Sequence, residues 1–222
     1  GVVLARTNFG EADRIITVLT PRNGKIRLLA KGVRKIKSRL AGGIELLSVN
    51  DMTYIEGKSG MGMLISSRLK TNYGNILKDV DRTMYAYEIL KLLNKITEDY
   101  PEEAYFDLLC DVLVGINDLA VAVDIIRLWV LVQILALAGH GINVTADAQG
   151  NALLPDARFA FGFDDVAFIS SERGTFNEGH IKILRLASRC LPSQLARIAN
   201  IQDYLPALLQ LVRAVTKQTM NI

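Results

Sequence analysis

The sequence predicts an α+β protein in which an N-terminal five-stranded β-barrel is followed by an α-helical domain with a small irregular β insert. Three observations predict this fold. Short runs of branched residues with turn signals fill residues 1 to about 72, a helical period of 3.6 residues begins near residue 76, and positive charge gathers in the first part. We place the domain boundary between residues 74 and 75, and the insert at about 141–172.

The first domain is predicted to form five strands, at Val2–Arg6, Ile15–Thr20, Lys25–Ala30, Leu46–Ile55 and Met61–Leu69. The sequence Pro21-Arg22-Asn23-Gly24 is a hairpin turn signal, and the segment Gly57–Gly60 is expected to join the last two strands. Closing the sheet into a barrel hides its edges. The stretch Lys31–Gly43 lacks a period and combines charge with glycine, so we expect a loop there.

The second domain is predicted to be helical over 81–98, 101–117, 120–138, 175–190 and 203–219. Pro101 followed by two acids is a good helix start, and Thr175 with Glu178 matches a capping box. Gly139 is a natural residue to end the third helix. That helix is the longest apolar run, but polar residues interrupt it at helical spacing, so we expect a buried helix and no membrane span.

The composition is that of a globular protein, because 50% of the residues are hydrophobic. Cys110 and Cys190 each lie in an apolar helical context, so we expect buried thiols rather than a disulfide. This fits a reducing compartment, and no signal peptide is visible. We therefore expect a cytoplasmic protein.

Few residues are available for catalysis or for metal binding. The chain has two histidines, His140 at a helix end and His180 early in a helix, where we expect a surface position. The histidines and cysteines are not at metal-ligand spacing, and Gly57–Gly62 lacks the residue order of a phosphate-binding P-loop. We therefore expect no enzyme, no catalytic residue, no cofactor and no metal.

The charge is spread very unevenly. Residues 1–70 carry 13 Lys and Arg against 5 Asp and Glu, whereas the other 152 residues carry 13 against 18. Such a basic module predicts a polyanionic partner, since Lys and Arg can follow a line of phosphates. A solvated charged face is the plainer alternative. The candidate nucleic-acid-binding residues are Arg14, Lys25, Arg27, Lys31, Arg34, Lys35, Lys37 and Arg39.

Base stacking is expected to be sparse, because Phe9, Tyr54 and Tyr73 are the aromatic residues of this module. A different class of function stays open as well. In that alternative, the chain is a protein-interaction module whose basic barrel docks an acidic protein.

Several segments in order resemble the opening of the RecO recombination mediators. They are Gly10-Glu11-Ala12-Asp13-Arg14-Ile15-Ile16-Thr17, Leu19-Thr20-Pro21, Gly24-Lys25-Ile26-Arg27, Ala30-Lys31-Gly32-Val33-Arg34-Lys35 and Ser38-Arg39-Leu40. Further on, Arg127-Leu128 with Gly139 and Gly141-Ile142 resembles the central helix of the family and its glycine-rich end. The resemblance covers essentially the whole chain and is strongest over 2–70.

The resemblance implies an OB-fold barrel and a non-enzymatic role in DNA repair and recombination. Members of the family bind single- and double-stranded DNA and anneal complementary strands. They bind the acidic C-terminal tail of single-stranded DNA-binding protein, and with RecR they help to load RecA. This implies a bacterial, cytoplasmic, nucleoid-associated protein that acts on RecA indirectly.

Two departures and one further site follow from the resemblance. Many members have a four-cysteine zinc site in the insert, but 143–170 contains no cysteine here, so we expect Phe159, Phe161 and Phe163 to hold it by packing. The usual basic C-terminal segment is absent after Lys217. Arg127 is a candidate for the partner peptide, and a structural arginine paired with Asp124 is the alternative.

Overall fold

The computed structural model describes residues 1–57, 60–100 and 102–220. By their contacts these residues form two compact units, Gly1–Asn117 and Asp118–Ile222, which we describe separately. The predicted turn residues Lys58 and Ser59 and the predicted helix start at Pro101 lie outside the described residues. The predicted division into 1–74 and 75–222 stays a prediction.

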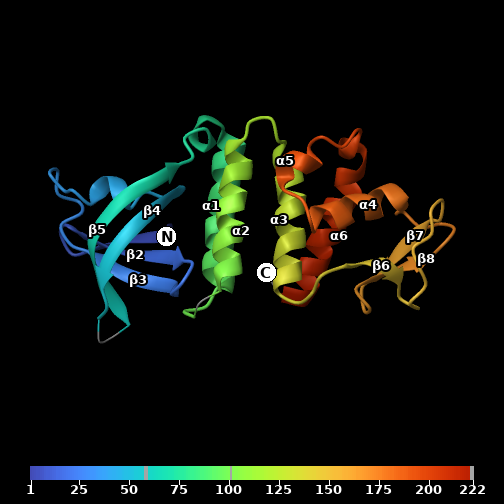
Figure 1. The fold of residues 1–222 in the computed structure, drawn as a ribbon, viewed down its shortest axis with the longest axis horizontal. Helices are drawn as coiled ribbons and strands as arrows, with labels where there is room; N and C mark the ends of the chain where they lie inside the picture. The colour runs from blue at the N-terminus through green and yellow to red at the C-terminus, as the bar shows by residue number, and fades with distance from the viewer. Residues whose placement is uncertain (58–59, 101, 221–222) are drawn as a thin grey trace. The chain divides into compact units, whose positions relative to one another are not determined.

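The first unit contains a closed five-stranded barrel in the order β1-β2-β3-β5-β4, which confirms the predicted fold (Figure 1). The strands are β1 (Val2–Phe9), β2 (Asp13–Thr20), β3 (Gly24–Ala30), β4 (Ser48–Ile55) and β5 (Met61–Asn72). Neighbouring strands are antiparallel except β3 and β5, which are parallel, and Val2 opposite Val49 closes the barrel.

Alternation along the strands fills the barrel, because every second side chain points inward. The core contains Val3 from β1, Ile16 and Val18 from β2, Leu28 from β3 and Leu64 from β5. Outward-facing residues can still be buried: Leu19, for example, is 1% exposed although it lies outside this core cluster.

Two helices complete the first unit, α1 (Val80–Ile96) and α2 (Glu103–Asn117), and short 3₁₀ turns lie at Ala41–Gly43 and Ile76–Lys78. Asp79 is the N-cap of α1, since its side chain accepts a hydrogen bond from the N–H of Arg82. Helix α1 packs against β1 and α2 against β2. The barrel is therefore covered on one side by the helices that follow it in the chain.

The second unit consists of α3 (Val123–Leu137), α4 (Glu178–Ala187), α5 (Pro192–Leu195), α6 (Ile201–Met220) and a three-stranded sheet. The sheet is the predicted insert, with β6 (Asn143–Asp147), β7 (Phe159–Gly162) and β8 (Ala167–Ser170) in the order β6-β8-β7. Helix α3 packs against α6, α4 and α5. Among the described residues no helix combines the length and the apolar character needed to cross a membrane.

The centre of the insert is Phe168, which is fully buried. The rings of Phe159, Phe161 and Phe176 surround it in edge-to-face geometry, with centroids 5.3 to 6.3 Å away. Of the three phenylalanines predicted to hold the insert, Phe159 and Phe161 do so, whereas Phe163 contacts Phe161 and is 40% exposed.

The predicted start of α4 and the predicted position of His180 are wrong. The N-cap is Asn177 and its capping-box partner is His180, instead of Thr175 with Glu178. Two backbone hydrogen bonds between Phe159 and Phe176 keep the chain extended through residue 176, so the helix begins only afterwards. His180 is 8% exposed, because its ring packs between Phe176 and Tyr204.

Candidate nucleic-acid interface

The segment Lys31–Leu40, called the basic loop here, leaves the barrel directly after β3 and has no regular secondary structure. It is anchored by two apolar side chains: Val33 is 3% exposed within the barrel core, and Leu40 packs against that core. Five cationic residues of the loop are exposed, namely Lys31, Arg34, Lys35, Lys37 and Arg39. The predicted cationic cluster is therefore assembled on one loop.

Hydrogen bonds to the β1–β2 turn fix the path of the basic loop. The backbone N–H of Gly32 donates to Oδ1 of Asp13 at 2.7 Å, and the N–H of Arg34 donates to the carbonyl of Ala12 at 2.9 Å. Gly32 has a φ of +63°, a conformation that favours glycine. Two residues at the start of the loop, Gly32 and Arg34, are thus hydrogen-bonded to the chain between β1 and β2 and to the first residue of β2.

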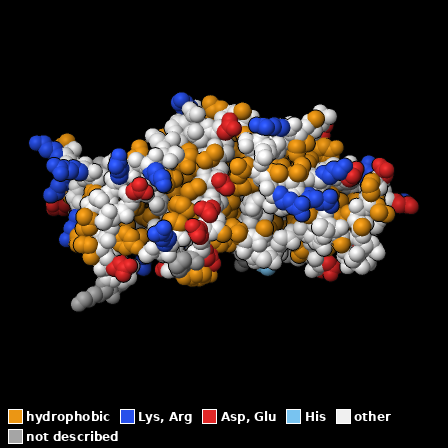
Figure 2. Space-filling model, viewed as in Figure 1, with side chains coloured by type: hydrophobic (Ala, Val, Ile, Leu, Met, Phe, Trp, Pro, Cys, Tyr) orange, Lys and Arg blue, Asp and Glu red, His pale blue; other side chains and the backbone are white. Residues whose placement is uncertain are grey.

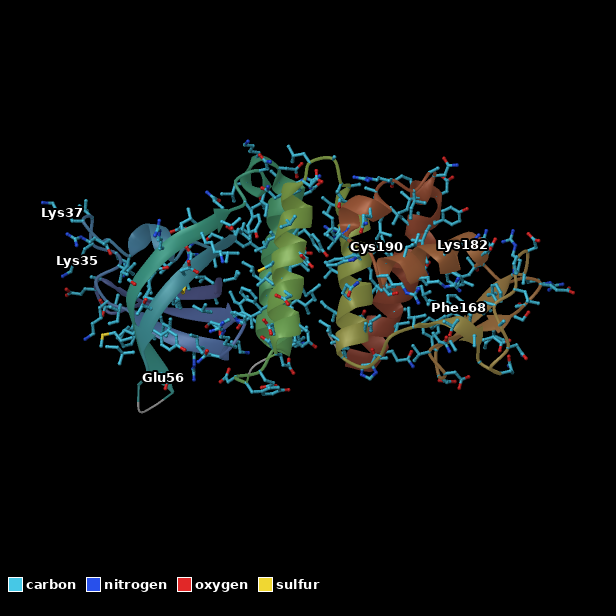
Figure 3. All side chains as sticks on the ribbon, viewed as in Figure 1. Lys35, Lys37, Glu56, Phe168, Lys182 and Cys190 are labelled. Atoms are coloured by element: carbon cyan, nitrogen blue, oxygen red, sulfur yellow. The ribbon has the colours of Figure 1, made fainter. Side chains whose placement is uncertain are left out.

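The cationic side chains of this loop extend away from the barrel, as Lys35 and Lys37 do in Figure 3. Among the described residues, Lys31, Lys35, Lys37 and Arg39 have no ion pair or side-chain hydrogen bond, and Nη1 of Arg34 donates only weakly, to the Gly10 carbonyl at 3.4 Å. Figure 2 shows blue atoms standing out at this end of the barrel. The charges are therefore available to an external anion.

Arg14 lies beside the basic loop. It is opposite Ala30, the last residue of β3, and its Nε donates to Oδ1 of Asn8 at 3.1 Å. Phe9, at the end of β1, is 52% exposed and provides an aromatic ring near the same turn. Tyr73 is buried and Tyr54 packs against the barrel core, so neither ring lies at the loop, and sparse stacking stays a prediction.

Lys25 and Arg27 do not join this cluster, because Lys25 lies near the start of β3 and Arg27 in its middle, whereas the loop leaves from its end. Arg27 is exposed and opposite Thr17. The Lys25 ammonium donates to the carbonyls of Asn94 at 2.9 Å and Thr97 at 2.6 Å, at the C-terminal end of α1. Lys25 is thus engaged at the end of a helix, and we expect it to contribute little to DNA binding; the role of Arg27 stays a prediction.

Arg127 lies on α3 in the second unit, with its Nε 3.8 Å from Oδ1 of Asp124 and its side chain 29% exposed. The pairing that was the alternative to peptide binding is therefore present. An exposed pair of this kind contributes little to stability. Peptide binding by Arg127 stays a prediction.

The nucleophilic and basic side chains are poorly placed for catalysis. Burial, with Asp107 adding to it, raises the pKa of the Cys110 thiol to about 11, so the thiol is protonated at neutral pH. Burial also lowers the pKa of His180, whose Nδ1 is engaged by Asn177. Cys110 and Cys190 are free and half-buried, and no group of three His, Cys, Asp or Glu that could hold a metal occurs within the described ranges.

Sequence reasoning missed the residues that position the loop. Asp13 was assigned no role from the sequence, whereas its carboxylate accepts a hydrogen bond from the loop backbone. Arg6 likewise pairs with Oε2 of Glu45 at 2.7 Å, so this acid is matched by a cation within the first unit. A carboxylate at the start of β2 and a glycine shortly after β3 were the sequence signal that could have suggested the bond between Asp13 and Gly32.

Comparisons with known proteins cover almost the whole chain. The family model "Recombination protein O N terminal" matches residues 1–73, and "Recombination protein O C terminal" matches residues 77–220. A DNA repair protein RecO of Listeria monocytogenes serotype 4b is 34% identical over 119 residues, which are 53% of this chain and 46% of the relative.

Two further relatives carry the same name, DNA repair protein RecO. The one from Acetivibrio thermocellus is 28% identical over 193 residues, 86% of this chain and 76% of the relative. The one from Trichodesmium erythraeum is 34% identical over 153 residues, 68% of this chain and 52% of the relative. The aligned part of the chain thus spans about half the length of the Listeria and Trichodesmium relatives.

Proposed function

Because the chain belongs to the RecO family of DNA repair and recombination proteins, we propose that it is a non-enzymatic mediator that binds DNA and anneals complementary strands. The observation that carries the proposal is the basic loop. Five exposed cationic residues follow one another over nine positions without an acid among them, and the loop backbone is fixed by Asp13 and Ala12.

The geometry of the loop suits phosphate rather than a particular base. Guanidinium and ammonium groups that have no internal partner can each replace a counterion of the DNA backbone. Contacts of this kind set position and affinity but read no sequence. We therefore expect binding to single- and double-stranded DNA with little sequence preference and with strong salt dependence.

Annealing follows from the same surface. Two complementary strands repel each other because both are polyanions, and a cationic loop lowers this repulsion when both are bound nearby. Base pairing then supplies the specificity. The process needs no covalent step, no metal and no nucleotide hydrolysis.

The proposed partners are those that membership of the family implies. We propose that the chain acts with RecR, binds the acidic tail of single-stranded DNA-binding protein through a surface that includes Arg127, and thereby helps RecA onto coated single strands. We place this activity in the bacterial cytoplasm, at the nucleoid.

Strand annealing tests the proposal directly. Two complementary oligonucleotides are mixed with the protein, with the Arg34→Ala/Lys35→Ala/Arg39→Ala variant, or with a charge-matched Lys91→Ala/Lys95→Ala/Arg213→Ala variant, all at exposed positions. We expect annealing by the protein and the charge-matched variant and a strong reduction in the loop variant. Equal annealing by both variants would refute the assigned site. Failure of the unaltered protein to shift any oligonucleotide would favour docking of an acidic protein instead.

A further inference from the structure

A cavity of about 390 Å³ opens at the end of the barrel opposite the basic loop. It is lined by Arg22 and Asn23 from the β2–β3 turn, Ile26 and Arg27 from β3, and Tyr54 from β4. A second hollow of about 350 Å³ shares four of these residues, Arg22, Asn23, Ile26 and Tyr54. We call this region the barrel mouth. Figure 3 shows Glu56 at the lower edge of the barrel, away from Lys35 and Lys37 at its left edge.

The floor of the mouth is apolar. Ile26 and Tyr54 point inward and pack against the barrel core while remaining partly exposed. A cavity of this volume is within the range of small-molecule sites, roughly 300 to 1,000 Å³. The Tyr54 ring offers a flat surface on which a planar group can stack.

The rim of the mouth is polar, and its side chains are exposed and available to a ligand. Arg22 and Arg27 are exposed, and neither guanidinium has an ion pair or hydrogen bond to the described part of the chain. The Asn23 side chain has no such partner either, since only its backbone N–H is bonded, to Thr20 at 3.0 Å. Guanidinium groups bind phosphate with two parallel hydrogen bonds, and a side-chain amide can pair with the edge of a base.

We propose that the barrel mouth binds a single nucleotide of a DNA strand, with its base against Tyr54 and its phosphate at Arg22 and Arg27. The inference rests on the proposed DNA-binding function and adds a second contact to it. An acidic peptide fits less well, because Glu56 lines the mouth and Asp51 lines the adjoining hollow, and both would repel side chains that carry charge along their length. A nucleotide brings its charge at one point.

Arg22 precedes β3 and the basic loop follows it, whereas Arg27 lies in the middle of the strand. The seven residues of β3 extend over about 23 Å at the rise of a strand, so Arg22 is at least that far along the chain from the loop. An OB-fold typically covers about 4 to 16 nucleotides of a single strand. One bound strand can therefore have its phosphates at the basic loop and one nucleotide in the mouth.

A ligand too short to bridge both contacts tests the mouth by itself. We would titrate 5′-phosphorylated dithymidylate into the full chain by calorimetry and compare Arg22→Ala with Arg68→Ala, an exposed cation on β5 that does not line the cavity. Losing the charged hydrogen bonds of Arg22 should weaken binding about tenfold, and Arg68→Ala should leave it unchanged. Arg22 lies in an exposed turn, so folding is not at stake.

Tyr54 provides an independent arm. Tyr54→Phe keeps the ring and should bind the dinucleotide like the unaltered protein, whereas Tyr54→Leu should weaken binding about tenfold through the lost stacking. Thermal unfolding of both variants checks that the core is intact.

The outcomes also separate this inference from the proposed function. Dinucleotide binding that survives Arg34→Ala/Lys35→Ala/Arg39→Ala but not Arg22→Ala supports the mouth. No binding of the dinucleotide, or equal binding by Arg22→Ala and Arg68→Ala, overturns the mouth even if a long oligothymidylate still binds. Unchanged binding of the long oligonucleotide by Arg34→Ala/Lys35→Ala/Arg39→Ala would instead contradict the assigned basic loop.

Discussion

The Asp13 carboxylate accepts a hydrogen bond of 2.7 Å from the backbone N–H of Gly32, so an acid holds the most basic loop of the protein in place. The bond joins the first residue of β2 to the second residue after β3. Two effects of replacing Asp13 therefore oppose each other. Removing its negative charge should raise the affinity for DNA, whereas releasing the loop should lower it.

Replacing Asp13 by alanine should weaken DNA binding although it removes an acid. Loss of one net hydrogen bond, about 1 kcal/mol, lowers the affinity by up to about fivefold by letting the loop leave its bound path. Fluorescence anisotropy with a labelled oligonucleotide measures the change. Asp13→Asn is the matched control, because its amide oxygen can still accept the bond, and it should bind at least as tightly as the unaltered protein. Tighter binding by Asp13→Ala would contradict the anchoring role.

The salt dependence of DNA binding should report the loop directly. Removing Arg34, Lys35 and Arg39 together should lower the slope of log affinity against log salt by about 2 to 3, since each phosphate contact contributes roughly 0.7 to 0.9. The change should be similar for different base sequences. Titrations at several salt concentrations, with the Lys91→Ala/Lys95→Ala/Arg213→Ala variant alongside, measure it. An equal loss of slope in that control would mean that net charge alone is responsible.

Lys25→Met should destabilise the protein without disturbing DNA binding. The variant leaves two carbonyls at the end of α1 without their charged donor, which should cost about 1.5 to 3 kcal/mol of unfolding free energy. Urea unfolding measures the change. Lys31→Met, at an exposed loop position, is the comparison and should behave in the opposite way. A large loss of affinity in folded Lys25→Met would return Lys25 to the interface.

Acid should weaken the second unit through His180. Burial, helped by Arg158, lowers the pKa of His180 from its ordinary value of 6.5, so the folded state binds fewer protons than the unfolded chain. The stabilisation is complete above pH 6.5 and is lost as the pH falls toward the lowered pKa. His180→Gln keeps a capping-box side chain that does not titrate. Unfolding free energies between about pH 5 and 8 should fall less with acid in His180→Gln than in the unaltered protein or in His140→Gln, whose site is exposed. Parallel curves for all three would contradict the assignment.

Arg127→Ala should lower the affinity for an acidic peptide that ends in an apolar residue. Its ion pair with Asp124 is partly exposed and long at 3.8 Å, so loss of this pair should itself cost less than about 1 kcal/mol. Calorimetric titration of the peptide gives the affinity and thermal unfolding gives the stability. Asp124→Asn, which frees the guanidinium of this acid, should bind the peptide more tightly. A large drop in stability with unchanged peptide affinity would make Arg127 a structural residue.

Local patterns of residues account for a large part of the fold. The five strands, an irregular loop within the predicted stretch 31–43 and the longer helices follow from alternation, turn residues and helical period, all of which are properties of neighbouring residues. The 3₁₀ turn at Ala41–Gly43 and the short helix Pro192–Leu195 were not predicted. The exposed cations of the basic loop could be listed for the same reason. A stretch with five like charges and no period stays in solvent whatever the rest of the chain does.

Residues of equal local character take different roles because of contacts between distant parts of the chain. Lys25 and Arg27 are two positions apart on β3 and point outward alike, yet Lys25 meets the end of α1, 69 residues away, and Arg27 meets solvent. Pairing of Phe159 with Phe176 moved the start of α4 from Thr175 to Asn177 and buried His180. These outcomes depend on contacts between distant segments, and such contacts leave no pattern in the residues nearby.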